Sequence, residues 1–216
     1  MPSCLGLYIE NNLIKYAKVT KERELVKVDS FGVKFYDKIG DAINQIISET
    51  FSYKIPISIN LSEETYQYFN MFSLLKKDDL KKAIETEFDS LCTEKGINRN
   101  AFETRYALVN NLEDKEKIKV IHISTNKASV NTIEQQFVEY RLSTISPIGT
   151  SISNIANLKP KENILVINME DETTLTTIVD QKIYSVEKLE EGSGTVLNSI
   201  NSKENIQPIR IDRLLF

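Results

Sequence analysis

The chain has 216 residues, of which 41% are hydrophobic and 27% are charged, a composition typical of a globular protein with one or two cored domains. Its net charge of -4 is spread along the chain as mixed signs, without a basic block that could neutralise a run of phosphates, so we expect no nucleic-acid partner. No stretch approaches the roughly 18 to 20 consecutive apolar residues that a membrane span needs, so we expect no direct membrane insertion by this chain.

The cysteines and the single histidine narrow the compartment and the chemistry. Cys4 and Cys92 lie far apart, and the chain begins without a cationic segment and an apolar signal core, which favours a cytoplasmic protein with reduced thiols. His122 lies in an alternating strand, where a core or edge role is the favoured interpretation. A catalytic triad built on histidine and a histidine-rich metal site are therefore not expected.

The first sixty residues predict strands around one helix. Segments 4–10, 13–19 and 24–35 alternate in hydrophobicity, and Asn11 and Asn12 suit a tight hairpin turn because Asn tolerates positive φ. Apolar residues then recur at helical spacing and form one stripe: Ile39, Ala42, Ile43, Ile46 and Ile47. A buried-looking strand follows at 54–60. We assign residues 1–61 to a first lobe.

Residues 62–143 predict a small inserted α+β subdomain. It would contain a strand at 66–75, paired strands at 102–111 and 117–125, and two amphipathic helices. The apolar face of the first helix, from Lys77 to Cys92, would consist of Leu80, Ile84, Phe88 and Leu91, and that of the second of Val130, Ile133, Phe137 and Tyr140.

The remaining chain predicts a return to the first lobe and the start of a second. Residues 144–160 would hold a short helix at 151–158, with Ile152, Ile155 and Leu158 facing inward, followed by a linker around Pro160. Residues 161–216 would hold three strands and, after a glycine turn, a helix, in the order of the first lobe. The apolar end at 214–216 needs cover, either from a continuing chain or from another molecule.

Two hairpin lobes of this kind that flank a cleft resemble the actin-like fold, and the motifs resemble those of the PilM family of type IV pilus assembly proteins, relatives of the division protein FtsA. In that family the first lobe opens with Gly-x-Asp-Ile-Gly-x-x-x-x-Lys, which falls on Gly6, Tyr8, Ile9, Glu10 and Lys15. The family's acidic helix, Glu-Leu-x-x-Ala-Ile-x-x-Glu, matches residues 78–91. The resemblance implies a mixed α/β (α+β) class with actin-like, ribonuclease H-like lobes, an inserted subdomain and an incomplete second lobe.

The same resemblance places a degenerate nucleotide site between the two hairpins. The family's second hairpin opens with Asp-Ile-Gly and a later Thr, which fall on Asn168, Met169, Glu170 and Thr174. The degenerate positions are Tyr8, Glu10, Asn11, Asn12, Lys15, Asn168, Glu170, Thr174, Gly192 and Gly194. Tyr8 and Asn168 replace the two aspartates that would orient a metal ion in the family. Glu10 and Glu170 stand where the family has glycines that leave room for the phosphates. We therefore expect a pseudo-ATPase with no catalytic residues, no metal and no cofactor. The alternative is an active ATPase that binds ATP and Mg²⁺ through Glu10, Glu170 or Asp171.

The resemblance also implies a partner. PilM-like proteins are cytoplasmic scaffolds that bind the cytoplasmic tail of a PilN-like membrane protein at the inner face of the cell membrane and couple a pilus machine to its motor ATPase. The cytoplasmic domain of the type II secretion protein GspL is similar, which leaves pilus and secretion machines both open; a polymer former like FtsA is a third hypothesis. We expect the partner to bind between the first lobe and the inserted subdomain, through Tyr66, Tyr68 and Phe72, unless both faces of that strand are internal.

Overall fold

The structure is a computed structural model that describes residues 2–10, 12–23, 25–61, 63–110, 116–152 and 162–204. Its first lobe is a five-stranded sheet with the order β3-β2-β1-β4-β8. The strands are β1 (Ser3–Ile9), β2 (Leu13–Glu22), β3 (Leu25–Phe35), β4 (Ile57–Leu61) and β8 (Leu142–Pro147). The pairs β1–β2 and β2–β3 are antiparallel, whereas β1–β4 and β4–β8 are parallel. This mixed sheet agrees with the expected class.

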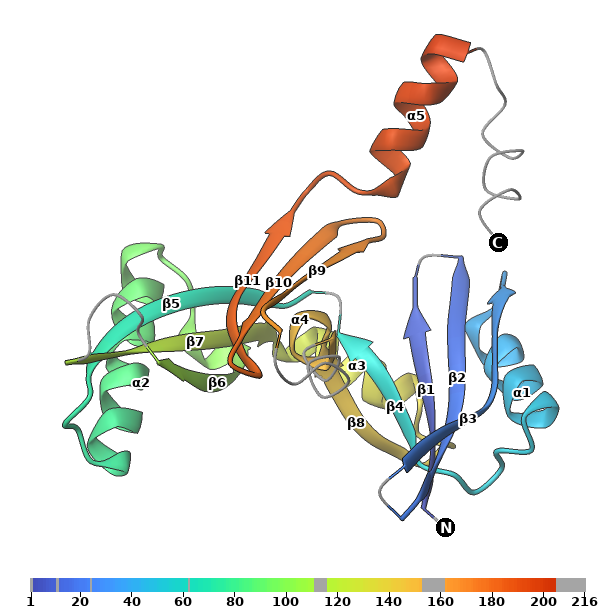
Figure 1. Cartoon of the computed structure of the whole chain (residues 1–216), viewed down its shortest axis with the longest axis horizontal. Helices are drawn as coiled ribbons and strands as arrows, with labels where there is room; N and C mark the ends of the chain where they lie inside the picture. Colours follow the sequence, from blue (N-terminus) through green and yellow to red (C-terminus); the bar gives the residue numbers. More distant parts are fainter. Residues whose placement is uncertain are drawn as a thin grey trace.

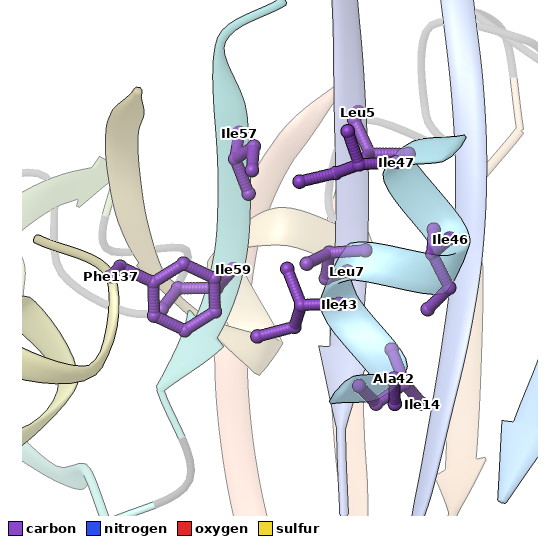
Figure 2. Close-up of a cluster of buried hydrophobic side chains, with 10 residues drawn as sticks. All are labelled: Leu5, Leu7, Ile14, Ala42, Ile43, Ile46, Ile47, Ile57, Ile59 and Phe137. Atoms are coloured by element: carbon purple, nitrogen blue, oxygen red, sulfur yellow. The ribbon is translucent and has the colours of Figure 1, made fainter. Parts of the chain in front are cut away.

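The core of the first lobe lies between this sheet and helix α1 (Ile39–Glu49), as Figure 2 shows. The predicted apolar stripe of α1 is confirmed, because Ala42, Ile43, Ile46 and Ile47 are all buried. They pack against alternate residues of β1, Leu5 and Leu7, and of β4, Ile57 and Ile59, together with Ile14 and Phe137. The apolar residues that recur every three to four positions in α1 thus pack against those that alternate in β1 and β4. This packing fixes β1 at the place from which its hairpin extends.

The inserted unit is a separate three-stranded sheet with the order β5-β7-β6. It consists of β5 (Thr65–Phe72), β6 (Phe102–Asn110), β7 (Lys117–Asn126), helix α2 (Lys77–Glu94) and a short 3-10 turn, Arg99–Ala101. Helix α2 buries Leu80, Ile84 and Phe88, as expected. Its fourth buried residue is Cys92 and not Leu91, which is half-buried, because the fourth residue after Phe88 returns to the sheet-facing side of the helix.

Helix α3 (Lys127–Gln136) follows β7, and its C-terminal end packs with the first lobe. Ile133, Phe137 and Tyr140 contact the core of the five-stranded sheet, and Leu142 begins a strand of that sheet. The packing therefore favours an inserted unit that ends near Asn126, earlier than the expected boundary at 143. The exact division of the chain into domains stays a prediction.

The second lobe begins with a three-stranded antiparallel sheet of order β11-β10-β9. Its strands are β9 (Ile164–Met169), β10 (Thr173–Val179) and β11 (Lys182–Leu189), and helix α5 (Ser193–Glu204) follows; Figure 1 shows α5 extending away from the sheet. The short helix α4 covers Ile148–Ile152, so it begins earlier than expected. Residues 153–160, with the expected inward-facing Ile155 and Leu158, and residues 214–216 lie outside the described residues.

Candidate functional site

The two hairpins predicted to flank a nucleotide site do face one another. In the first, the Glu10 amide donates to the Leu13 carbonyl at 2.9 Å and closes the turn after β1; in the second, the Glu170 amide donates to the Glu172 carbonyl at 3.1 Å. Between them lies a hollow of about 470 Å³ that we call the hairpin cleft. Its lining includes Tyr8, Ile9, Glu10, Tyr36, Asn60, Glu63, Ile148, Glu170, Asp171, Glu172, Thr174 and Lys188.

An ion pair crosses from one hairpin to the other. Lys15 Nζ on β2 lies 2.5 Å from Glu170 Oε2 at the end of β9, and both side chains are largely buried. Lys15 Nζ also lies 5.6 Å from the centroid of the Tyr8 ring. The family motif aligns Lys15 with a lysine of the nucleotide site, but here its ammonium group contacts a carboxylate of the opposite hairpin.

The end of β1 is fixed by two residues that the sequence motif did not mark. The Ile9 amide donates to Asn60 Oδ1 at 2.7 Å, and Asn60 Nδ2 donates to the Ile9 carbonyl at 3.1 Å. The Tyr36 hydroxyl donates to the Glu10 carbonyl at 2.5 Å. Asn60 follows β1 by some fifty residues, so the motif itself carries no signal for this contact; only the parallel pairing of β1 with β4 brings the two together.

Two carboxyl groups occupy the places where the family motif has glycine. Glu10 and Glu170 are close enough for their carboxyl groups to interact by a hydrogen bond, and Glu10 Oε1 is buried without a partner among the described residues. Partial burial, the Glu170 contact and the nearby Asp171 raise the pKa of Glu10 to about 7, against the opposing effect of Lys15. Glu10 is therefore only partly ionised near neutral pH, and its protonated carboxyl group can donate a hydrogen bond to the Glu170 carboxylate.

Tyr8 and Asn168 stand where the family has its metal-orienting aspartates. Burial raises the pKa of the Tyr8 hydroxyl well above its usual range, the Asn168 side chain opposes this shift by a hydrogen bond, and Glu170 adds to it. Tyr8 is thus neutral at any physiological pH. The Asn168 Nδ2 atom is itself buried. Neither side chain can offer a negatively charged oxygen to a cation.

The other positions of the two motifs do not contribute a charged group to the cleft. Asn11 lies outside the described residues, and Asn12 is exposed. Thr174 is buried in the cleft lining. A Cβ on Gly192 would lie 2.1 Å from the Asp171 carbonyl oxygen, because the chain there packs directly on the second hairpin, whereas a Cβ on Gly194 would meet open space. The Ser193 amide, next to Gly192, donates to the Glu170 carbonyl at 2.7 Å.

The two predicted partner-binding tyrosines have contacts within the chain itself. Tyr68 spans to the second lobe: its hydroxyl donates to the Val186 carbonyl at 2.5 Å and accepts from the Val186 amide at 2.6 Å. The Tyr66 hydroxyl donates to Glu64 Oε1 at 3.0 Å and accepts from the Gly149 amide at 3.2 Å. These contacts argue against both tyrosines as free anchors. Phe72 is 66% exposed, and its role in binding stays a prediction.

Strand β11 covers part of the second face of β5. One face, with Phe69 and Met71, packs under α2, and the other, with Tyr66, packs against Ile183 and Tyr184 of β11. Lys119 Nζ lies between the Tyr68 and Tyr184 rings, 4.6 and 4.3 Å from their centroids. The face with Phe69 and Met71 is therefore internal, whereas the other face is covered at Tyr66 and exposed toward Phe72, so the choice between an internal strand and a partner surface stays open.

A groove does lie between the first lobe and the inserted unit, but it borders on other strands than expected. This interunit groove has a volume of about 530 Å³ and is bounded by β6, β7, α3 and β8. Its lining includes Leu61, Glu103, Arg105, Ile123, Thr125, Lys127, Val130, Asn131, Leu142, Thr144, Ile145 and Pro147. Both β6 and β8 are edge strands of their sheets, so the groove presents strand edges that an extended peptide can pair with.

The described residues show no metal cluster and no helix that could span a membrane. Residues 2–10, 12–23, 25–61, 63–110, 116–152 and 162–204 contain no group of three acidic, histidine or cysteine side chains placed to hold a metal ion, and no helix among them is long and apolar enough to cross a membrane. No protein-family model matches the sequence. No curated protein sequence matches it either.

Solved structures do match the fold. One is a chain of a PilM-PilN type IV pilus biogenesis complex, with a TM-score of 0.76 at 14% identity over 98% of this chain and 68% of that one. The cytoplasmic domain of EpsL, an inner membrane component of the type II secretion system of Vibrio cholerae, gives 0.54 at 10% identity over 87% and 71%. The ethanolamine utilization protein EutJ from Carboxydothermus hydrogenoformans gives 0.50 at 10% identity over 99% and 61%. The chain therefore has the PilM-like, actin-like fold that its sequence motifs predict.

Proposed function

We propose that the chain is a non-catalytic, cytoplasmic scaffold of a type IV pilus or type II secretion assembly machine. It binds the cytoplasmic segment of a PilN-like membrane protein at the inner face of the membrane and links that protein to the motor ATPase. The observation that carries the proposal is the interunit groove, in a chain whose fold is similar to that of PilM from a complex with PilN. The similarity to the EpsL cytoplasmic domain supports the same class of machine.

The chemistry of the hairpin cleft supports a non-catalytic role. A triphosphate in the cleft would face Glu10 and Glu170 while Lys15 is paired with Glu170. Each carboxylate at about 4 Å from a phosphate charge costs on the order of 1 kcal/mol in water and about 4 kcal/mol at an intermediate dielectric. Two such groups, with no aspartate at positions 8 and 168 to orient a metal, offset the binding energy of a nucleotide.

Calorimetry with ATP and Mg²⁺ tests the cleft. We expect no saturable binding below a Kd of about 1 mM, which corresponds to about -4 kcal/mol. The alternative, an ATPase that uses Glu10, Glu170 or Asp171 for Mg²⁺, has one observation in its favour, since these carboxylates do gather at the cleft. Tight binding that disappears in Glu170→Gln would establish that alternative and reject the pseudo-ATPase.

The geometry of the interunit groove supports the proposal that the partner segment binds there. The groove is bounded by two edge strands, β6 and β8, with which an extended peptide could pair, and apolar residues such as Leu142 and Ile145 form part of its lining. The strand Thr65–Phe72, which we expected to border it, lies on the far side of the inserted sheet from β6. On this proposal the binding residues belong to β6, α3 and β8, which the sequence pattern did not mark.

Two neighbouring positions of α3 provide a matched test of the groove. Asn131 lines the groove and Thr132 does not, although both are exposed. We expect Asn131→Arg to weaken binding of the fluorescently labelled cytoplasmic segment of the PilN-like protein from the same organism by about tenfold or more, or about 1.4 kcal/mol. Thr132→Arg should leave it unchanged. Equal affinity of wild type and Asn131→Arg in fluorescence anisotropy would move the interface out of the groove.

A further inference from the structure

Strand β3 is an edge strand that carries exposed apolar side chains. It lies at one end of the order β3-β2-β1-β4-β8, and Figure 1 shows it on the side of this sheet away from the inserted unit. Phe31, Val33 and Phe35, which we call the apolar row, are 80%, 38% and 58% exposed. An edge strand with such a row is the kind that pairs with another strand, unless charges or bulges prevent the pairing.

The apolar row lies on the face of the sheet that α1 does not cover. Gly32 pairs with Tyr16, and Tyr16 pairs with Leu7 in the core beneath α1, so Gly32 belongs to the α1 face. The residues of the apolar row alternate with Gly32 and Lys34 and therefore point to the opposite face. Lys34, the only charged residue between positions 30 and 36, forms an ion pair with Glu49 of α1. The apolar row itself thus carries no charge.

The main-chain groups of the apolar row are directed to the outer edge of β3. The Tyr36 amide donates to the Asn12 carbonyl at 3.0 Å, and hydrogen-bonded pairs alternate along an antiparallel ladder. Lys34 and Gly32, two and four residues before Tyr36, therefore direct their N–H and C=O groups to β2, and the residues between them direct theirs outward. Among the described strands, only β2 pairs with β3, so this outer edge is open to another chain.

The apolar row is symmetric about Val33. If two β3 strands pair in antiparallel orientation about a two-fold axis at Val33, Phe31 of each copy lies opposite Phe35 of the other. The two Val33 side chains lie opposite one another, and Gly32 lies opposite Lys34, so the two lysines stay apart. Aromatic pairs and β-branched residues are favourable cross-strand neighbours in a sheet.

Neighbouring registers lack this match. An axis at Gly32 would set Phe35 opposite Asp29, which lies at a bulge where the register with β2 shifts. An axis at Lys34 would set two lysines directly opposite one another, which is unfavourable. An axis between two residues would pair outward-directed main-chain groups with groups directed to β2, so the ladder could not form. The segment is therefore complementary to itself in one register, and this selects a second copy of the chain as its occupant.

We propose that residues 30–36 of β3 pair with the same residues of a second copy of this chain, in antiparallel orientation about an axis at Val33. The five-stranded sheets of the two copies then form one continuous sheet, with both α1 helices on the same face. Strand β8 is the opposite edge of the sheet, so the contact leaves the interunit groove open and does not depend on the proposed function. Because one short strand from each copy makes the contact, we expect a weak dimer with a Kd of about 10 to 100 µM.

Analytical ultracentrifugation measures the dimer as the protein concentration rises from about 5 to about 500 µM. We expect the mean mass to rise from that of a monomer toward that of a dimer. Val33→Lys sets two ammonium groups opposite one another on the axis and should weaken the dimer by about tenfold or more. Val138→Lys, at an 80% exposed position outside β3, is the control and should dimerise like wild type. A wild type that stays monomeric, or an equal loss in both variants, would reject the pairing.

A pair of variants at the two phenylalanines tests the register and does not depend on the folding of Val33→Lys. Phe31→Glu and Phe35→Lys each set a charge opposite an aromatic ring, so each should weaken its own dimer by about fivefold or more. In an equimolar mixture the two new charges lie opposite one another and the remaining rings still pair, so the mixture should dimerise more strongly than either variant alone. Phe31→Glu mixed with Val138→Lys should show no such gain. A gain in both mixtures, or in neither, would reject the axis at Val33.

Amide hydrogen exchange identifies the surface that the dimer uses. The amides of Phe31 and Val33 are directed outward, so they should exchange about threefold or more slowly at the highest concentration than at the lowest. The amides of Gly32 and Lys34 are directed to β2 in monomer and dimer alike, and their exchange should not change. A dimer in which exchange at Phe31 and Val33 is not slowed uses another surface, and that result would overturn the proposal.

Discussion

Glu10 links the charge state of the hairpin cleft to pH. Its pKa is raised from 4.5 to about 7 in the folded protein, so between these values the folded state holds more protons than the unfolded state. Stability therefore falls as the pH rises from about 4.5 to 7, and the loss is complete above the folded pKa. We expect Glu10→Gln to be more stable than wild type at pH 8, with the difference shrinking toward pH 5.

Thermal unfolding of wild type and Glu10→Gln between pH 5 and pH 8 measures the effect. The quantity to compare is the difference in stability between the two proteins, because other groups titrate in this range in both. Glu85→Gln, an exposed change on α2, is the control and should follow wild type. A constant difference between Glu10→Gln and wild type at all pH values would show that folding does not raise the pKa of Glu10.

Contacts between individual residues of distant segments were the features that the sequence predicted least well. The motif predicted that Tyr8, Glu10, Lys15, Asn168 and Glu170 would converge, and they do. It could not predict that Lys15 pairs with Glu170, because that contact depends on the distance between two hairpins 155 residues apart. The contacts of Asn60 and Tyr36 were missed for the same reason, since hydrogen bonds between distant segments leave no periodic pattern in the sequence.

At the scale of elements, helix α2 provides the clearest stability test. Ile84 is 1% exposed and packs with Met71, Leu80 and Val120, so an aspartate there would be buried without a partner. We expect Ile84→Asp to unfold the inserted unit, lowering its stability by about 3 kcal/mol or more. Circular dichroism and hydrogen exchange of β7 measure it. Lys82→Asp, exposed on the same helix, should have little effect; unfolding by both variants would indicate that charge, and not burial, destabilises the helix.

Helices and strands could be predicted where the hydrophobic pattern of a few neighbouring residues determines them. The stripe of α1 and the strands of both hairpins follow from periodicity and turn residues, which act over a few positions. The end of the inserted unit and the cover of β5 by β11 were not predictable, because they depend on which apolar faces meet in three dimensions. An apolar strand with two buried faces looks the same in sequence whether its own chain or a partner covers it.

At the scale of the whole molecule, Tyr68 connects the inserted unit to the second lobe. Its hydroxyl holds both the amide and the carbonyl of Val186. We expect Tyr68→Phe to lower the free energy of unfolding by about 1 to 2 kcal/mol, because the ring remains while the Val186 peptide group loses its partner. Amide exchange at Val186 should accelerate. Tyr53→Phe is the control, because Tyr53 is exposed and its hydroxyl donates to the nearby Ser48 Oγ.

A second variant at the same position, Tyr68→Ala, tests the interface that the sequence predicts. If Tyr68 were a partner anchor, Tyr68→Ala would weaken capture of the PilN-like segment by about 1 to 2 kcal/mol in a folded protein. The structure leads us to expect unchanged capture at temperatures where the variant is folded, together with a lower unfolding temperature. A loss of capture at full stability would restore the sequence-based assignment.

Gly192, just before α5, and Gly194, within α5, differ in the space around them, and this difference should be visible in the sequences of homologues. Gly192 has no space for a side chain, because the second hairpin lies against it, whereas nothing surrounds Gly194. Across evolution, position 192 should remain glycine wherever the hairpin keeps its path, irrespective of whether the protein binds a nucleotide, while position 194 should drift freely. A conserved glycine at 192 in homologues of this chain would then be no sign of a surviving ATPase, because the packing of the backbone alone is sufficient to preserve it.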